Sequence, residues 1–342
     1  MRSDPRDTHH AIAEEEKNMS RPTRHRRQDS VHAAALAIIV LAIIALAVCS
    51  PAYAQAKKQA PAPKQITFAS SDEAVKVFVD ALKANDTKKV LSILGPGSEE
   101  IVSSGDPVAD RNARETYLKH YDEKNRIEAS AKKWVLYVGN DDWPFPIPVV
   151  KQGNTYRFDT KAGKREMLAR RIGANELSAI QVCLAYTDAQ RDYALKDRDS
   201  DGVLEYAQKF MSAPGKKDGL YWETKEGEQQ SPLGPLFAAA QERGYEKAVS
   251  GGKPVPYYGY YYRILKAQGK SAPGGAYDYV VNGRMMGGFA LVAYPAQYGS
   301  SGVMTFIVNH DGIVYQKNLG KNTQKIAEAM KAYDPDKTWK KL

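Results

Sequence analysis

The residues best suited to chemistry are the acidic side chains between Asp197 and Glu205, in the stretch DRDSDGVLE. Asp197, Asp199 and Asp201 alternate along the chain, so that three hard oxygen ligands can face one side of a tight turn. Gly202 stands at the sixth position, where a calcium loop needs a residue that permits a sharp bend. This spacing matches the first half of a calcium loop.

Two later positions decide how complete the loop is. Val203 can add its main-chain carbonyl, and Glu205 stands at the ninth position, where a ligand binds directly or through water. Gln208 occupies the twelfth position, where a bidentate Glu is expected. We therefore expect a weak structural Ca²⁺ site, with an acidic turn that holds no ion as the alternative. Outside the cell, a calcium site with a dissociation constant of about 10⁻⁴–10⁻³ M is sufficient.

The sequence offers little support for catalysis, and we assign no catalytic residue. His120 and His310 are the histidines that follow the apolar leader described below, which excludes a zinc site made of several histidines. Cys183 lies in an apolar helical stretch and is expected to be buried and inert. The alternative to a non-enzymatic protein is an envelope hydrolase that uses paired carboxylates.

Such a hydrolase would pair Asp142 with Asp278 or Asp311. A cleft in which these acids converge would favour this activity, whereas an exposed tyrosine surface would favour binding. The sequence by itself does not bring them together. We therefore expect a binding or scaffolding protein.

Aromatic residues mark two candidate partner surfaces. Trp143 and Phe145 lie in the rigid stretch DDWPFP, and Tyr258, Tyr260 and Tyr262 lie in a run of tyrosines that predicts a strand. Tyrosine and tryptophan combine an apolar face with a polar group, and they are enriched at interfaces. The expected partner is an envelope protein or a glycan, and core packing is the alternative for at least one face of the strand.

The N-terminal region predicts export. An uncharged apolar run covers residues 33–48, follows a cluster of arginines and precedes a small-x-small pattern that ends at Ala54. A membrane span needs about 20 residues, and this run is shorter. We expect cleavage near Ala54, a periplasmic or secreted protein and no stable membrane span afterwards. An uncleaved anchor and a lipoprotein at Cys49 are the alternatives, and translation starts at Met1 or Met19.

The bulk composition fits a globular protein and argues against nucleic-acid binding. The 342 residues allow about two domains, and 43% hydrophobic residues suffice for a sizeable core. The net charge is +9, but no arginine-rich run follows the leader.

The elements that must position these residues predict an α+β protein with two domains. We expect a leader over 1–54, a linker over 55–67, an N-terminal domain over 68–172 and a C-terminal domain over 173–342. In the N-terminal domain, helices come first, the first of them begun by a Ser70–Glu73 capping box, and antiparallel strands follow, with a hairpin turn at Gly153-Asn154. This order is similar to that of cystatin-like and NTF2-like domains.

The C-terminal domain is expected to combine one long helix with an antiparallel sheet. The helix is predicted from near Asn175 to about Lys196. Asn282-Gly283 and Asp311-Gly312 predict hairpin turns between the later strands.

Several stretches resemble the DUF2950 family of exported bacterial proteins of unknown function. They are GDP (105–107), DWPFPIP (142–148), AQRDYALKDRDSDGVLEYA (189–207), DGLYW (218–222), SPLGPL (231–236), YDYVVNGRMMGGF (277–289) and GVMTFIVNHDGIVYQ (302–316). The resemblance implies export and no particular activity. The second domain also loosely resembles the globular heads of type IV pilin-like proteins, although the chain lacks their processing site and long apolar N-terminal helix.

Overall fold

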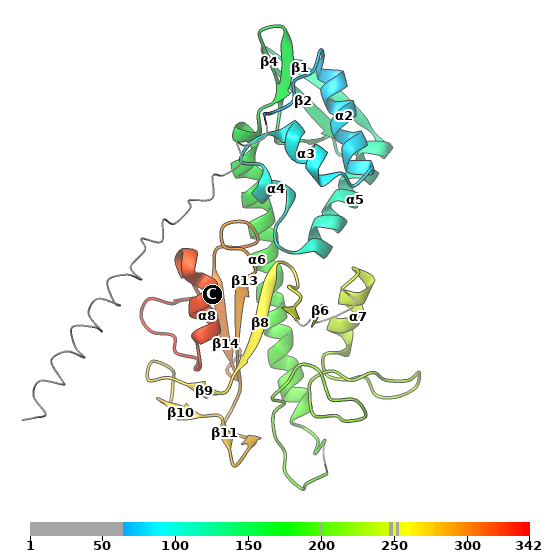
Figure 1. Ribbon diagram of the computed structural model, residues 1–342. Helices are drawn as coiled ribbons and strands as arrows, with labels where there is room; N and C mark the ends of the chain where they lie inside the picture. The colour runs from blue at the N-terminus through cyan, green and yellow to red at the C-terminus, as the bar shows by residue number, and fades with distance from the viewer. Residues whose placement is uncertain (1–63, 199, 246–248, 251–252) are drawn as a thin grey trace, which may run out of the picture. The chain divides into compact units, whose positions relative to one another are not determined.

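The computed structural model describes residues 64–198, 200–245, 249–250 and 253–342. The predicted signal peptide, with Cys49 and Ala54, lies outside these residues, as does Asp199 of the predicted calcium loop. These described residues belong to one compact unit. Helices and antiparallel sheets both occur in this unit, so the predicted α+β class is confirmed (Figure 1).

The first part of the described chain consists of helices followed by a sheet, in the predicted order. The helices are α2 (Ser71–Lys83), α3 (Thr87–Leu94), α4 (Glu99–Val102) and α5 (Pro107–Glu123). The strands are β1 (Asn125–Ser130), β2 (Lys133–Val138), β3 (Trp143–Pro144), β4 (Val149–Gln152) and β5 (Thr155–Phe158). They pair antiparallel in the order β1-β2-β4-β5, and β3 pairs with β2. The predicted turn at Gly153-Asn154 joins β4 to β5.

Side-chain caps explain where the first helices begin. The Ser70 hydroxyl accepts a hydrogen bond from the N–H of Glu73 at 3.1 Å, and the Glu73 carboxylate accepts one from the N–H of Ala69 at 2.8 Å. The first bond satisfies a backbone donor that a helix start leaves without a partner. Ser70 and Glu73 therefore cap the helix as predicted, except that Glu73 bonds the N–H of Ala69 rather than that of Ser70. Asp86 caps α3 in the same way, through the N–H of Lys89 at 2.9 Å.

One hydrophobic cluster holds α2 and α3 against the first sheet. The Phe78 ring of α2 lies 5.1 Å from the Phe158 ring and 5.5 Å from the Phe145 ring, measured between centroids. All three side chains are buried. Aromatic pairs at this spacing add to the free energy gained by burying their area.

Helix α6 (Thr160–Tyr193) is the longest element and begins earlier than predicted. The prediction placed its start near Asn175, whereas the helix also includes the preceding stretch, which is rich in charge and contains two glycines. The Asp159 side chain accepts the N–H of Ala162 at 3.3 Å and so begins the helix at Thr160. The predicted boundary between residues 172 and 173 thus falls inside a continuous helix.

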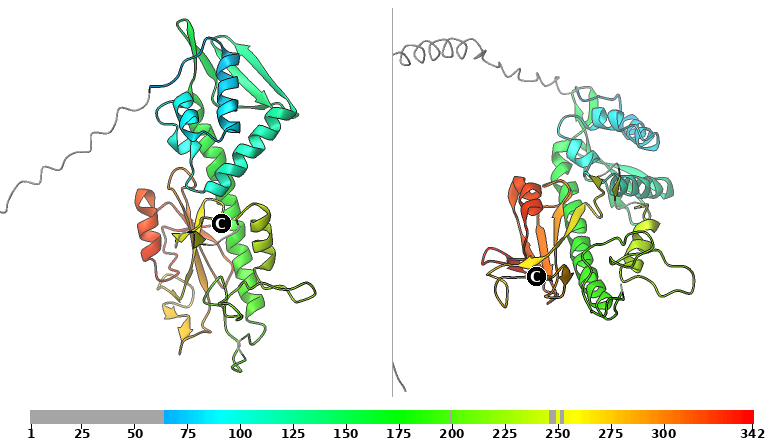
Figure 2. Two further views of the ribbon diagram at one scale, coloured as in Figure 1. Left: turned by 45° about the vertical axis from the view of Figure 1, so that its right-hand side comes forward. Right: turned by 60° about the horizontal axis from the view of Figure 1, so that its bottom comes forward.

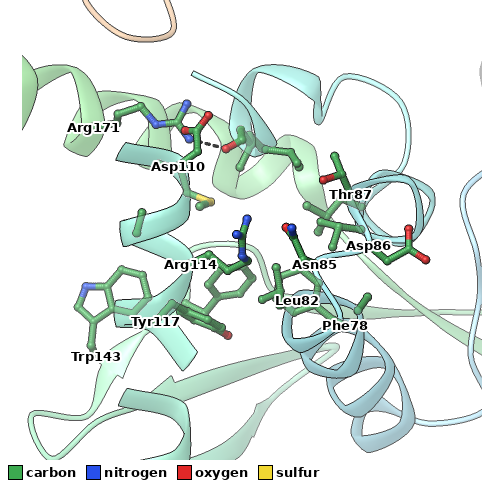
Figure 3. Close-up of a pocket in the computed structure, with 18 residues that line it drawn as sticks. Phe78, Leu82, Asn85, Asp86, Thr87, Asp110, Arg114, Tyr117, Trp143 and Arg171 are labelled. Atoms are coloured by element: carbon green, nitrogen blue, oxygen red, sulfur yellow. Dashed lines mark hydrogen bonds between the residues drawn. The ribbon is translucent and has the colours of Figure 1, made fainter. Parts of the chain in front are cut away.

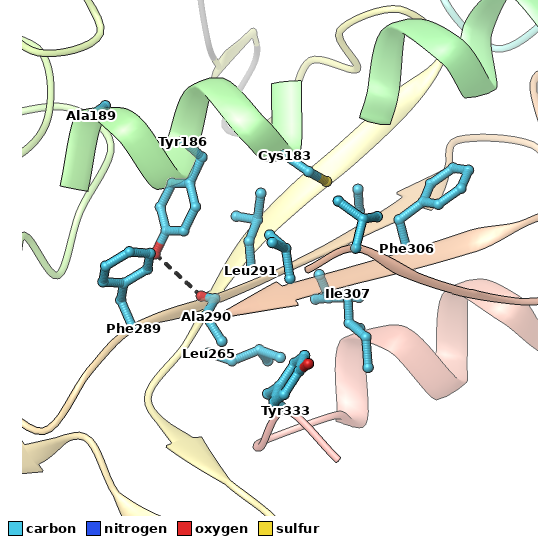
Figure 4. Packing of buried hydrophobic residues seen from close by; sticks show 14 of the residues in the cluster. Cys183, Tyr186, Ala189, Leu265, Phe289, Ala290, Leu291, Phe306, Ile307 and Tyr333 are labelled. Atoms are coloured by element: carbon cyan, nitrogen blue, oxygen red, sulfur yellow. Dashed lines mark hydrogen bonds between the residues drawn. The ribbon is translucent and has the colours of Figure 1, made fainter. Parts of the chain in front are cut away.

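The second sheet is buried on both faces. Its strands pair antiparallel in the order β16-β15-β14-β13-β8, and they lie between α6 in green and α8 in red (Figure 2). Every residue of β13 (Ala290–Pro295) and β14 (Thr305–Asn309) is buried. Apart from Thr305 and Asn309 their residues are apolar and do not alternate with polar ones, as is typical of strands covered on two sides. Figure 4 shows Cys183 and Tyr186 of α6 directed at one face of the sheet.

The remaining elements are short. The other strands of the second sheet are β8 (Tyr260–Leu265), β15 (Tyr315–Lys317) and β16 (Lys340–Lys341). Three two-stranded hairpins are β6 (Val249–Ser250) with β7 (Lys253–Pro254), β9 (Ala267–Gln268) with β10 (Tyr277–Asp278), and β11 (Val280–Val281) with β12 (Arg284–Met285). The helices are α7 (Gly234–Glu242), the 3₁₀ turn η1 (Gly320–Asn322) and α8 (Thr323–Ala329).

The predicted turns in this region are present. Asn282-Gly283 joins β11 to β12, and Asp311-Gly312 lies between β14 and β15. None of the helices in the described part of the chain combines the length and the apolar composition needed to cross a membrane.

Candidate functional site

Trp143 and Phe145 line a cavity of about 270 Å³. Strand β3 carries Trp143, and the N–H of Phe145 donates to the carbonyl of Leu136 at 2.7 Å, which ties the segment to β2. Phe145 is buried, whereas Trp143 is 37% exposed at the cavity margin. The guanidinium of Arg170 lies 5.1 Å from the Trp143 ring centroid, within the range of a cation–π contact.

The cavity lies among α2, α3, α4, α5 and α6 (Figure 3). Most of its wall is apolar. The apolar lining residues are Phe78, Ala81, Leu82, Val90, Leu94, Ile101, Val102, Ala113, Trp143, Phe145 and Met167. Concave, largely apolar sites with a few polar groups are the usual form of small-ligand sites, and this volume lies just below their ordinary range.

The polar groups at the cavity differ in how far their hydrogen-bonding capacity is already used. The Tyr117 hydroxyl is buried and has no hydrogen-bond partner among the described residues. Burial raises the pKa of Tyr117, so the hydroxyl stays protonated and can donate. Buried polar groups are nearly always paired in proteins, so an unpaired hydroxyl at a cavity calls for an explanation.

The two carboxylates at the cavity are partly engaged. Asp86 accepts the N–H of Lys89, and Asp110 accepts the N–H of Ser104, both at 2.9 Å. Arg171 donates to backbone carbonyls at the end of α4, and burial lowers its pKa. These side chains stabilise the walls of the cavity.

The tyrosines predicted as a partner surface lie in different surroundings. Tyr260 is fully buried, and its hydroxyl donates to the carbonyl of Met304 at 2.9 Å. Tyr258 is half-buried, and its ring lies 5.3 Å from the guanidinium of Arg243. Tyr262 is half-buried and lines a second cavity of about 380 Å³.

The second cavity is lined by apolar and tyrosine side chains. They are Val182, Tyr186, Phe210, Met211, Leu233, Leu236, Phe237, Ala240, Tyr245, Val255, Pro256, Tyr257, Tyr261 and Tyr262. No charged side chain is among them. The hydroxyls of Tyr186 and Tyr262 already donate to the carbonyls of Ala290 and Tyr257, each at 3.2 Å. This cavity therefore offers few groups that could orient a polar ligand.

The predicted calcium loop has the bend that the sequence indicates. The Asp197 carboxylate accepts the N–H groups of Ser200 at 2.7 Å and Gly202 at 2.8 Å. Gly202 has a φ of +83°, a conformation that glycine adopts without steric cost. Asp201 accepts the N–H of Val203 at 2.9 Å. These bonds draw the loop around the Asp197 carboxylate.

The donor set fits a calcium ion only in part. Oδ2 of Asp201 lies 2.6 Å from the guanidinium of Arg284, which already supplies a positive charge to one expected ligand. Glu205 is half-buried. Among the residues that the structure describes, no three acidic, histidine or cysteine side chains come together as a metal site, and Asp199 lies outside those residues.

The carboxylates of the hydrolase alternative lie in separate sheets or turns. Asp142 pairs with Lys124 at 3.1 Å and with Arg126 at 3.2 Å, and these hydrogen-bonded cations lower its pKa. Asp278 belongs to β10, and Asp311 accepts a bond from the Asn309 amide at 3.1 Å in the turn after β14. Because Lys124 and Arg126 stabilise Asp142 as an anion, Asp142 is poorly suited to donate a proton in catalysis.

Cys183 and His120 lie in helices, and His310 lies in a turn. Cys183 is fully buried, and burial raises its pKa to about 12, which keeps the thiol protonated. His120 lies 3.3 Å from Glu123 on α5. His310 is half-buried in the turn after β14, and its Nδ1 has no partner among the described residues.

The sequence did not single out Tyr117 or Arg114, which are two of the polar groups at the cavity with unused capacity. Both residues lie on α5 one turn apart, and this i, i+3 spacing places them on the same side of the helix. That spacing was the available signal, but a helix alone does not reveal which side faces a cavity.

Comparison with known proteins identifies a family but no characterised relative. A family model described as "Protein of unknown function (DUF2950)" matches residues 65–342. No curated protein and no solved structure matches the chain. The looser resemblance to pilin-like heads is not confirmed.

Proposed function

The chain belongs to the DUF2950 family, whose description assigns no function, and from this starting point we propose that it is a non-enzymatic binding protein of the periplasm or cell envelope. Its ligand site is the cavity lined by Trp143 and Phe145. The observation that carries this proposal is a largely apolar cavity lined by Tyr117, whose buried hydroxyl has no partner among the described residues. A ligand would supply the missing hydrogen bond.

The compartment is part of the proposal. The apolar run over residues 33–48 and the small residues up to Ala54 support export with cleavage near Ala54, and Cys49 offers lipid attachment as the alternative. Tyr258 and Tyr262, in the second part of the chain, are half-buried. We propose that the surface on which they lie binds an envelope protein or a glycan.

Leu82→Trp should remove one binding site for an uncharged apolar dye such as N-phenyl-1-naphthylamine. Leu82 is half-buried and lines the cavity, so a larger ring at this position would fill the space that the dye needs. Fluorescence titration gives the number of dye molecules bound per chain, and we expect this number to fall by one. A melting curve of the variant verifies that it is folded.

Leu177→Trp is the matched control. Leu177 is 68% exposed on α6 and does not line either cavity, so the dye stoichiometry should equal that of the unmodified chain. Equal stoichiometry in the folded Leu82→Trp variant would show that the cavity is not a ligand site.

We also propose that the loop from Asp197 to Glu205 binds Ca²⁺ weakly and has a structural role. At ten times the dissociation constant, the ion should raise the free energy of unfolding by about 1.4 kcal/mol. The melting temperature should therefore rise with millimolar Ca²⁺ in the unmodified chain and not in Asp199→Ala. Asp188→Ala, which removes an exposed acid from α6, should keep the response. No rise, or the same rise in Asp199→Ala, would exclude the ion.

A further inference from the structure

The cavity at Trp143 has hydrogen-bond donors whose capacity is unused. Arg114 is half-buried, lines the cavity and forms no hydrogen bond or ion pair with any residue that the structure describes. The Asn85 amide also lines it (Figure 3). The buried Tyr117 hydroxyl adds a third donor.

The acidic groups around the same cavity do not neutralise Arg114. Neither Asp86 nor Asp110 forms an ion pair with it, and both carboxylates accept backbone N–H bonds. The other cation at the wall, Arg171, is engaged with backbone carbonyls. Among the described residues, the lining charges without an ion pair or side-chain partner are the carboxylates of Asp86 and Asp110 and the guanidinium of Arg114, and of these only Arg114 can donate hydrogen bonds to a ligand.

We infer that the ligand is an apolar monocarboxylate, an inference that rests on the proposed function of this cavity. Its apolar body lies against Phe78, Leu82 and Phe145, and its carboxylate accepts hydrogen bonds from Arg114 and Tyr117. A guanidinium binds a carboxylate in a bidentate manner, and such charge-assisted bonds are about twice as strong as neutral ones. An alcohol of the same length would leave most of the Arg114 donors without a partner.

The size of the cavity limits the length of the apolar body. A volume of about 270 Å³ is small for a ligand site, so a medium-length chain fits better than a long lipid tail. Octanoate and octan-1-ol are therefore suitable probes, because they share an apolar chain and differ in the charged group.

The test is calorimetric titration of both probes at pH 7 into the chain from Gln55 onward, which contains the whole compact unit. We expect octanoate to bind about tenfold more tightly than octan-1-ol, which corresponds to about 1.4 kcal/mol. Arg114→Gln should weaken octanoate binding to the level of the alcohol and leave the alcohol unchanged. Arg114→Lys should restore part of the preference, because it restores the charge without the planar fork.

Arg111→Gln is the matched control. Arg111 also lies on α5, but its guanidinium is near Glu115 at 4.0 Å and does not line the cavity. Its removal should leave both affinities unchanged. Tyr117→Phe keeps the ring and deletes the hydroxyl, and it should weaken octanoate binding while the chain remains folded.

The outcomes separate the two proposals. Equal affinities for octanoate and octan-1-ol that Arg114→Gln does not alter would overturn the carboxylate inference and leave the cavity as an apolar ligand site. Absence of octanoate binding would also overturn it. The dye titration of Leu82→Trp depends on neither charge nor Arg114, so only its failure would overturn the proposed site itself.

Discussion

Replacing Asp106 with alanine should lower the free energy of unfolding by about 3–5 kcal/mol. The carboxylate is fully buried and accepts four hydrogen bonds. Oδ1 accepts the N–H groups of Val108 at 3.1 Å and Ala109 at 3.0 Å, and Oδ2 accepts the Tyr245 hydroxyl and the Gly259 N–H, each at 2.8 Å. Alanine removes the cap of α5 and leaves the two distant donors without their acceptor.

The Tyr245 hydroxyl remains a donor over the ordinary pH range. Burial and the neighbouring Asp106 carboxylate both raise the pKa of Tyr245, so the proton stays on the phenol. The stretch from Gly105 to Pro107, one of those that resemble the family, therefore has a structural role: it connects the start of α5 to residues 139 and 153 positions later in the chain.

Urea denaturation of the chain from Gln55 onward measures this effect, with two variants for comparison. Asp86→Ala removes the cap of α3, in which the carboxylate accepts only the exposed N–H of Lys89. This variant should lower the free energy of unfolding by about 1 kcal/mol. Asp106→Asn keeps one acceptor oxygen and should fall between the two alanine variants. A loss in Asp106→Ala no larger than that in Asp86→Ala would contradict the role given to the buried carboxylate.

Asp106 also shows what the sequence can and cannot predict. The Asp-Pro pair predicts a helix start, and α5 begins there, because a cap depends on residues within one turn. The bonds to Tyr245 and Gly259 depend on how distant segments fold together, and no local pattern indicates them. Likewise, the bend at Gly202 was predicted, but the ion pair between Asp201 and Arg284 was not.

The candidate ligand site was predicted only in its aromatic part. Trp143 and Phe145 were singled out because they lie in a rigid aromatic–proline stretch, and both line the cavity. Arg114 and Tyr117 were missed, because α5 has a weak amphipathic pattern and the cavity exists only where five helices meet. Tyr260 could not be told from Tyr262 by type, and the burial of the first depends on β14 and its neighbours.

Gly163→Ala and Gly173→Ala should change stability in opposite directions, although both glycines lie inside α6. Alanine in a helix interior normally stabilises by about 0.5–1 kcal/mol relative to glycine. A Cβ on Gly173 would have no neighbour within 4 Å, so Gly173→Ala should show this gain. The free energy of unfolding from urea denaturation provides the measurement.

Gly163→Ala should instead destabilise by about 1–3 kcal/mol, because a Cβ there would overlap the neighbouring backbone. It would lie 2.6 Å from the carbonyl carbon of Pro146 and 2.7 Å from Cγ1 of Ile147. Neither position is the free end of a flexible side chain, so the helix or the segment between β3 and β4 must shift. If Gly163→Ala were instead stabilised, α6 would lie farther from Pro146 and Ile147 than the structure shows.

The same close approach explains how α6 contributes to the cavity. Without a side chain at Gly163, the first turns of α6 can lie directly on the segment that carries Trp143 and Phe145. This position brings Met167 to the cavity wall. Gly163→Ala should therefore weaken dye binding as well as stability, whereas Gly173→Ala should leave the dye affinity unchanged. If Gly163→Ala lost stability but bound the dye as before, the close approach of α6 at Gly163 would not be needed to form the cavity.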